Sequence, residues 1–212
     1  MIMECARGGA DIVKIQVYRS HALFGSLEKR YLEFSKEEIA GIEALCMDLE
    51  IGFMASVFSP EDVDHLASSM RMPADGIPYV KLAARSGDDA ELCKYVQATF
   101  KNAQVIVSNP SEEVRKLRVT PIYTVRSYPA MLSEVEMPDF YAPDASFIGY
   151  SDHTYGIAAC LKAAAYGAQY IEKHYTLSKY KQCNLEKAHL CSMNYEELKQ
   201  IRELGDAIRA IR

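Results

Sequence analysis

Short apolar segments alternate with amphipathic helix patterns along nearly the whole chain, and this alternation constrains the fold more than any other feature. The segments that predict strands are 11–18, 52–58, 78–83, 104–108 and 120–125, with two more inside 147–176. Strict strand–helix alternation implies parallel strands joined by right-handed crossovers. The sequence therefore predicts an α/β fold, and its seven βα units fit a TIM-type (β/α)8 barrel with the first strand missing.

A doubly wound open sheet is the competing architecture. Such a sheet usually carries a glycine-rich phosphate loop directly after its first strand. Here the first strand runs into Val17-Tyr18-Arg19, which is unlike such a loop. We therefore expect the barrel.

The chain length favours one hydrophobic core. With 212 residues we expect a single domain over 1–212. An apolar pattern over residues 2–6 predicts the last turns of a helix, which Gly8-Gly9 closes. A helix that ends so close to the first residue suggests missing upstream sequence, with Met1 an internal codon of a longer reading frame.

Two helix starts are clearly marked. Ser35 with Glu38 three residues later forms a capping box, and Ser59 precedes a proline at the first helical position. Residues 19–34, between the first strand and Ser35, carry few regular signals and predict a long loop. Loops of this length in compact domains tend to be functional or mobile.

Composition excludes several classes of function. The formal net charge is −5, without the clustered lysines and arginines of a nucleic-acid-binding face. No apolar run approaches the roughly 20 residues that span a membrane, and the N-terminus lacks a signal-peptide pattern. Cys46, Cys93 and Cys160 fall on apolar helix positions, which predicts buried thiols in a reducing cytoplasm.

The residues best suited to chemistry follow the last two strands. One strand ends in Ser151-Asp152-His153-Thr154 and the next in Glu172-Lys173-His174. Because the carboxyl ends of neighbouring parallel strands meet, we expect the two histidines, 21 residues apart, to lie close together. Neutral imidazoles suit a divalent metal with an open coordination position, and the carboxylate beside either histidine would be a further ligand or would orient a ring. A proton-transfer pair and a hydrogen-bonded structural pair are the alternatives.

A second group of polar residues lies on the other strands. Lys14 and Lys81 fall inside apolar strands, where an unpaired lysine is costly to bury. A salt bridge inside the barrel is one interpretation. The other is an anion site, in which both lysines and the hydroxyls of Ser56, Ser108 and Ser151 hold a phosphate or carboxylate. The convergence of several such groups on one rim favours the anion site.

Other candidates carry weaker signals. His21 in the long loop and His65 on a helix are expected to be solvated. Tyr128 is either a hydroxyl that contacts ligand or a packed aromatic. A zinc site would draw on residues that lack a fourth ligand at a recognised spacing, namely Cys183, His189 and Cys191.

The order and spacing of these motifs resemble the sialic acid synthase (NeuB) family over nearly the whole chain. The matching segments are Gly9-Ala10-Asp11, Val13-Lys14-Ile15-Gln16, Phe58-Ser59, Lys81-Leu82, Gly149-Tyr150-Ser151-Asp152-His153-Thr154 and Ile171-Glu172-Lys173-His174-Tyr175-Thr176. The last two segments together are fairly specific to that family, whereas the first two alone are weaker.

The resemblance implies a barrel that condenses phosphoenolpyruvate with an N-acetylated hexose, an amino sugar, to make a sialic acid-like nonulosonic acid. It implies that His153 and His174 hold Mn²⁺ or Mg²⁺, which polarises the sugar aldehyde for attack by C3 of phosphoenolpyruvate. Lys81 joins the two histidines as a catalytic residue, and a homodimer is expected. The residues expected to bind substrate are Lys14, Gln16, Ser56, Ser108, Tyr128 and Ser151.

The sequence also departs from the family pattern. The family's first strand, with its Glu, and its small C-terminal domain are absent, and the segment 81–86 has lost a Ser and a carboxylate. The segment Glu186-Lys187-Ala188-His189 stands where the family has a sugar-binding Asp. One hypothesis is a divergent synthase whose sugar is not N-acetylmannosamine. The others are a non-catalytic barrel that binds a metal or anion or serves as an assembly partner, and a different metal-dependent aldolase.

Overall fold

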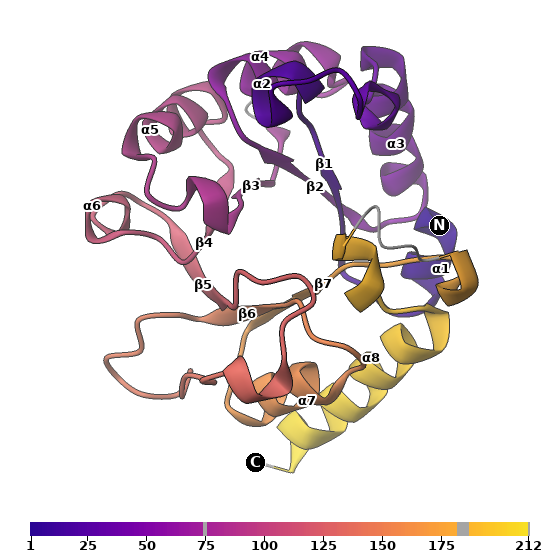
Figure 1. Cartoon of the computed structure of the whole chain (residues 1–212), viewed down its shortest axis with the longest axis vertical. Coiled ribbons are helices and arrows are strands. Elements are labelled where there is room, and N and C mark those ends of the chain that lie inside the picture. The colour runs from indigo at the N-terminus through magenta and orange to yellow at the C-terminus, as the bar shows by residue number, and fades with distance from the viewer. Residues whose placement is uncertain (74–75, 182–186, 212) are drawn as a thin grey trace. The chain divides into compact units, whose positions relative to one another are not determined.

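The computed structural model describes residues 1–73, 76–181 and 187–211. The strands are β1 (Ile12–Gln16), β2 (Gly52–Val57), β3 (Tyr79–Leu82), β4 (Gln104–Ser108), β5 (Thr120–Thr124), β6 (Gly149–Asp152) and β7 (Tyr170–Lys173). The α-helices are α1 (Ile2–Arg7), α2 (Ser20–Phe24), α3 (Lys36–Asp48), α4 (Pro60–Ser69), α5 (Ala90–Thr99), α6 (Glu112–Arg115), α7 (Ala158–Ala165) and α8 (Tyr195–Ala210). The predicted strand–helix alternation is present, and Figure 1 shows the elements in chain order.

The chain divides into two compact units, which are described separately. Residues 11–120 together with Ile2 form one, called here the N-terminal unit. Residues 121–212 together with Met1 and 3–10 form the other, called the C-terminal unit. Each unit has parallel strands of its own and helices packed against them.

In the N-terminal unit, β1 to β4 pair in sequence order and are all parallel. Helices α3 and α4 pack on β2 and on each other, and α5 packs on α4 and β4 (Figure 1). Side chains alternate between the two faces of a strand. One face therefore carries the small and branched apolar residues that are fully buried, among them Ala55, Val57, Val80, Leu82 and Val107.

The helix starts are those that the sequence predicts. Ser35 caps α3, and Ser35 and Glu38 make the reciprocal bonds of a capping box, 3.2 Å from the Glu38 amide to the Ser35 hydroxyl and 2.8 Å from the Ser35 amide to the Glu38 carboxylate. Ser59 caps α4 by accepting the Asp62 amide, with Pro60 at the first helical position. Both caps satisfy amides that a helix N-terminus would otherwise leave unpaired.

The segment between β1 and α3 is more ordered than its sequence suggests, because it contains α2 and the short 3-10 helix η1 (Arg30–Leu32). Glu33 organises it: its carboxylate accepts the Ser20 amide at 2.6 Å and pairs with Arg19 at 3.3 Å. The expectation that His65 is solvated is wrong, since its ring contacts Arg19 at 2.6 Å and the Phe34 carbonyl at 2.9 Å. These bonds tie the segment to α4, a partnership that residue spacing alone does not reveal.

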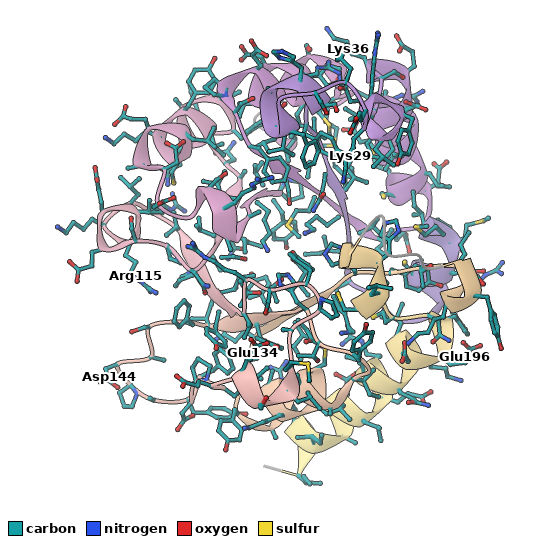
Figure 2. The ribbon with its side chains drawn as sticks, viewed as in Figure 1. Lys29, Lys36, Arg115, Glu134, Asp144 and Glu196 are labelled. Atoms are coloured by element: carbon teal, nitrogen blue, oxygen red, sulfur yellow. The ribbon has the colours of Figure 1, made fainter. Side chains whose placement is uncertain are left out.

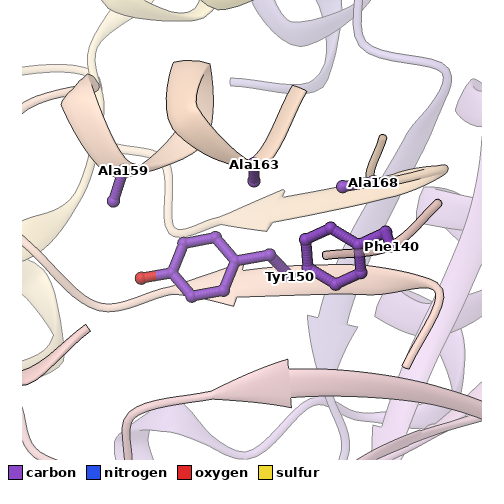
Figure 3. Close-up of a cluster of buried hydrophobic side chains, with 5 residues drawn as sticks. All are labelled: Phe140, Tyr150, Ala159, Ala163 and Ala168. Atoms are coloured by element: carbon purple, nitrogen blue, oxygen red, sulfur yellow. The ribbon is translucent and has the colours of Figure 1, made fainter. Parts of the chain in front are cut away.

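In the C-terminal unit, β5, β6 and β7 are parallel and in register. Tyr150 of β6 is completely buried and packs with Phe140 and with the alanines of α7 and of the turn that follows (Figure 3). The alanine-rich sequence of this helix lets its backbone come close to the strands, as expected, because Ala159 and Ala163 project only a methyl group toward the tyrosine. Helix α8 packs alongside α7.

Helix α1 ends as its glycines predict. The Gly8 amide bonds to the Glu4 carbonyl at 2.8 Å, and Gly9 has a φ of 89°, a left-handed conformation that favours glycine. A Cβ at Gly8 would lie 2.7 Å from Leu198 of α8, so the glycine also permits close packing of the two helices. The Arg202 guanidinium donates to the Gly9 carbonyl at 2.8 Å and completes this contact.

The five cysteines within the described part of the chain are all free and buried, in agreement with the sequence. Burial, followed by the charge of Asp89, raises the pKa of Cys93 to about 11. Cys183 lies outside the described residues, so the zinc site predicted from Cys183, His189 and Cys191 stays a prediction. Among the helices described, none has the length and apolar character needed to cross a membrane.

The close packing of α7 predicts the effect of a larger side chain. Ala163→Leu should lower the free energy of unfolding by about 1–3 kcal/mol, because the added carbons have no space beside Tyr150. Urea denaturation followed by far-UV circular dichroism measures the change. The matched control is Ala165→Leu, on the exposed side of the same helix, which should change the midpoint little. Equal effects of the two substitutions would contradict the packing shown here.

Candidate functional site

The candidate site in the C-terminal unit is built on the register of three strands. Thr124, Ser151 and Glu172 are register partners across β5, β6 and β7, and so lie on one face of the sheet. Continuing the register between β6 and β7 by one pair beyond Asp152 and Lys173 brings His153 opposite His174. Side chains two residues apart along a strand lie on the same face of the sheet. Both histidines therefore follow the face that carries Ser151 and Glu172.

The two imidazoles lie side by side, as the sequence predicts. Their ring centroids are 6.0 Å apart with an interplanar angle of 33°. Tyr128 packs against both, with its ring centroid 3.8 Å from that of His153 and 5.7 Å from that of His174. His153 is buried and His174 is half-buried. The structure thus brings together three of the residues predicted from sequence.

One hydrogen bond fixes the tautomer of His153. Its Nδ1 lies 2.6 Å from the Val125 carbonyl oxygen, which can only accept. Nδ1 therefore carries the ring proton. In the neutral ring the lone pair is then on Nε2, the arrangement in which a histidine can serve as a metal ligand while its other nitrogen is held by a backbone carbonyl.

The backbone of each histidine is held by a later loop. The Ala130 amide donates to the His153 carbonyl at 2.8 Å, and the Met193 amide donates to the His174 carbonyl at 2.7 Å. Each contact belongs to an isolated parallel bridge one residue beyond the histidine. The strand ends are thereby extended past the sheet, so the two rings project from restrained backbone.

The loop that carries Tyr128 is organised by Glu134, which Figure 2 labels. The Glu134 carboxylate accepts the Met131 amide at 2.6 Å and the Ser127 hydroxyl at 3.3 Å. It belongs to the 3-10 helix η4 (Leu132–Glu134) within the irregular segment predicted after β5. A surface carboxylate therefore shapes the loop that places an aromatic ring on the histidine pair.

Ser151 has a hydrogen-bond partner on the neighbouring strand β7. Its hydroxyl donates to the Glu172 carboxylate at 2.9 Å. A serine that has given its only proton to a carboxylate offers lone pairs to a third group. In this arrangement Ser151 and Glu172 act together, and the pair presents acceptors on the histidine face.

Asp152 points to the opposite face, where it forms a fully buried ion pair. Lys173 Nζ lies 2.7 Å from Asp152 Oδ2, with the two side chains 1% and 0% exposed. The other carboxylate oxygen accepts the Tyr150 hydroxyl at 3.1 Å and the Thr154 amide at 2.8 Å. Burial and, next, the charge of Asp152 raise the pKa of Cys160, whose thiol contacts the same carboxylate. Asp152 is thus the centre of a structural network and not a neighbour of the rings.

The predicted anion-binding residues of the N-terminal unit share one face of its sheet. Gln16, Ser56 and Lys81 are register partners across β1, β2 and β3, and Lys14 and Ser108 fall on the same face by the two-residue alternation. Lys81 is 2% exposed, Ser108 2% and Ser56 0%. Among the described residues, the Ser56 hydroxyl is one of three buried side-chain oxygens or nitrogens without a hydrogen-bond partner. Buried polar groups are normally paired, so this face is polar beyond what packing requires.

The donor set of the histidine pair fits a divalent metal. Neutral imidazole nitrogens are ligands of divalent transition metals, and the Val125 contact gives His153 the required tautomer. Within the ranges that the structure describes, no cluster of three or more His, Cys, Asp and Glu side chains could hold an ion. The two histidines stay the metal ligands that the sequence predicts, and any further ligands would come from water or substrate.

The sequence profile of the NeuB family matches residues 1–212, the whole chain. This chain belongs to the NeuB family. The resemblance seen in the SDHT and EKH motifs is thereby confirmed, and those motifs are the ones that build the histidine pair.

Named relatives agree with the family. The chain is 25% identical over 236 residues to N-acetylneuraminate-9-phosphate synthase of Drosophila melanogaster, covering 95% of this chain and 60% of that protein. It is 26% identical over 247 residues to N,N'-diacetyllegionaminic acid synthase of Campylobacter jejuni, covering 99% and 73%. A protein of Methanocaldococcus jannaschii is 27% identical, and this chain covers 63% of it. The chain thus spans roughly three-fifths of the length of two of these relatives.

Solved structures confirm the predicted fold class. The sialic acid synthetase of Leptospira borgpetersenii, solved with citrate, matches with a TM-score of 0.80 and 26% identity over 100% of this chain and 77% of that one. A DAHP synthase of Thermotoga maritima matches with a TM-score of 0.71 at 10% identity, which shows the fold alone. The chain has the α/β, TIM-type fold of the NeuB synthases, with seven strands in its described part.

Sequence reasoning missed Lys173. It was read only as part of the Glu172-Lys173-His174 motif, although the spacing contained a signal. Ser151 and Glu172 are 21 residues apart, as are Asp152 and Lys173 and the two histidines. A constant offset between two strands predicts register partners, and therefore an ion pair between Asp152 and Lys173. The residues of the altered sugar segment begin at Glu186, which lies outside the described residues.

The hydrogen bonds of two histidines predict opposite tautomers. His153 should carry its proton on Nδ1, because Val125 accepts there, and His65 should carry it on Nε2, because the Phe34 carbonyl accepts there. Long-range ¹H–¹⁵N correlation spectra distinguish the two tautomers when they are recorded on metal-free protein whose histidine rings are uncharged. His65 is the internal control, and an Nε2–H signal from His153 would contradict the geometry.

Proposed function

We propose that the chain catalyses the metal-assisted condensation of phosphoenolpyruvate with an N-acetylated hexose to form a sialic acid-like nonulosonic acid. The observation that carries this proposal is the His153–His174 pair, 6.0 Å between ring centroids, with Tyr128 against both rings. The relatives named as N-acetylneuraminate-9-phosphate and N,N'-diacetyllegionaminic acid synthases support the product class.

His153 and His174 would hold Mn²⁺ or Mg²⁺. When bound, the ion supplies Lewis-acid polarisation of the sugar aldehyde. The Val125 carbonyl keeps the His153 proton on Nδ1, so that Nε2 stays a ligand nitrogen. Tyr128, packed on the His153 ring, limits the rotation of that ring and would contact the sugar beside it.

Phosphoenolpyruvate would be held by the polar face of the N-terminal unit. The buried Lys81 and the half-buried Lys14 offer positive charge to its phosphate and carboxylate, and charge-assisted bonds of this kind are strong. The unpaired Ser56 hydroxyl offers a donor that the fold does not use elsewhere, and Gln16 and Ser108 lie on the same face. In the C-terminal unit, Ser151 and Glu172 offer acceptors that suit sugar hydroxyls or the attacking water.

The reaction forms a bond between C3 of phosphoenolpyruvate and the aldehyde carbon, adds water at C2 and releases phosphate. The protein's contribution is to hold both substrates and to exclude other reactions of the enol carbon. We further propose that the protein works in the cytoplasm and as a homodimer. The free, buried cysteines support a reducing compartment, and the dimer rests on the family resemblance.

Metal binding is the first test. Mn²⁺ titration followed by electron paramagnetic resonance should give a weaker affinity, by about 100-fold or more, in His153→Ala and in His174→Ala, because each loses a direct ligand. His21→Ala is the matched control, since His21 is exposed on α2. If the control and both site variants bind Mn²⁺ alike, the ion is held elsewhere and this part of the proposal fails.

Catalysis is the second test. With Mn²⁺, phosphoenolpyruvate and a panel of N-acetylhexosamines, the protein should release phosphate only when an accepted sugar is present. Lys81→Met should reduce the rate by about 10²–10³-fold, because it removes a buried charge from the anion site. Lys94→Met, at a lysine whose side chain is 50% exposed, is the control and should keep the wild-type rate.

Absence of phosphate release with every sugar, in protein that binds Mn²⁺ through the histidine pair, would contradict catalysis. That result would favour the alternative that the sequence raised, a barrel that binds a metal or anion without turnover. The lost Ser and carboxylate of segment 81–86 are the features that would then account for it.

A further inference from the structure

We propose that the buried Asp152–Lys173 ion pair is a positioning device that holds the two histidines in register for a shared ion. This inference rests on the proposed metal site and assigns a role to two residues that do not face it. The pair joins the residue before His153 to the residue before His174.

The placement of the pair is the first argument. Asp152 and Lys173 are register partners, so the ion pair crosses from β6 to β7 at the last pair of both strands. The next residue on each strand is a histidine whose side chain lies on the opposite face. A shift of either strand end by one residue would turn its ring away from the other. The ion pair acts at the position where such a shift would begin.

The number of bonds is the second argument. Lys173 Nζ donates to Asp152 Oδ2 and to the Thr154 carbonyl, both at 2.7 Å. The lysine is therefore hydrogen-bonded to the residues on both sides of His153. Asp152 Oδ1 accepts the Thr154 amide at 2.8 Å and so closes the turn around the same histidine. Rotation of the His153 backbone would break all of these bonds together.

The cost of burial is the third argument. Both side chains are almost completely inaccessible, at 1% and 0% exposure. A buried ion pair is weak evidence for stability, because desolvation offsets the attraction, and apolar residues of the same volume often replace it without loss. Stability alone therefore does not explain why these two residues are charged. Positioning of the adjacent histidines would explain it.

The test uses a double variant, because removal of one partner alone leaves a buried charge and endangers the fold. Asp152→Asn with Lys173→Met removes both charges while nearly keeping the volume. The matched control is Lys199→Met with Glu203→Gln, an exposed pair on α8 with side chains 55% and 61% exposed. Circular dichroism establishes the folded fraction of each protein, and Mn²⁺ affinity is measured by electron paramagnetic resonance on folded protein.

The wild type and the control should bind Mn²⁺ with equal affinity. The folded double variant should bind it about 10–100-fold more weakly, the effect expected when the groups that orient a ligand are lost. A purely structural role would lower the folded fraction and leave the affinity of the folded molecules unchanged. That second result would overturn the proposal.

Two further measurements keep the outcome decisive. If the double variant does not fold, Tyr150→Phe replaces it, since this removes one donor to Asp152 and keeps the ion pair. It should weaken Mn²⁺ binding by a smaller factor, and wild-type affinity would count against the proposal. If the wild type binds no Mn²⁺ through its histidines, the metal proposal fails, and ¹⁵N spectra of metal-free protein test the positioning role. His153 should then lose its single Nδ1–H form in the double variant or, failing that, in Tyr150→Phe. A retained single form would overturn the positioning role as well.

Discussion

The register between β6 and β7 is the constraint on which the histidine site depends. It is set by three successive contacts along the two strands: Tyr150 with Ile171 in the apolar core, Ser151 with Glu172 on the site face, and Asp152 with Lys173 on the helix face. Because the side chains of a strand alternate, these contacts fix both faces at once. The histidines come next, and their pairing follows from contacts already made.

The two faces of the sheet formed by β5, β6 and β7 differ in polarity. The α7 face is apolar apart from the Asp152 network, and alanines bring the helix close enough to exclude water from the ion pair. In such surroundings the electrostatic attraction within a charge pair is stronger than in water. The site face carries hydroxyls, a carboxylate and imidazoles, groups that bind and exchange protons. The helix packing thus restrains the strand ends from the face opposite the histidines.

The sequence predicted much of this arrangement, and the reasons are physical. Hydrophobic periodicity and helix caps predicted the helices and strands. Ser35, Ser59 and the glycines after α1 determine helix ends through contacts with residues close to them in sequence. The nearness of His153 and His174 was predictable because parallel strands align their carboxyl ends. What local patterns could not give were bonds between distant segments. The Arg19–His65 contact joins residues 46 positions apart with no regular spacing between them, and only the fold selects it.

The polar face of the N-terminal unit poses a different problem from the histidine pair. Its residues were predicted from the free-energy cost of burying an unpaired charge. A lysine such as Lys81 is rarely found in an apolar strand unless another group compensates its charge. The structure adds that Lys81 lies in register with Ser56, whose hydroxyl is buried and unpaired. A fold selected for stability alone would place alanine at Ser56, since a buried hydroxyl without a partner costs about 1–3 kcal/mol. The buried Ser56 hydroxyl, in register with a buried lysine, is the observation that favours the proposed anion site on this face.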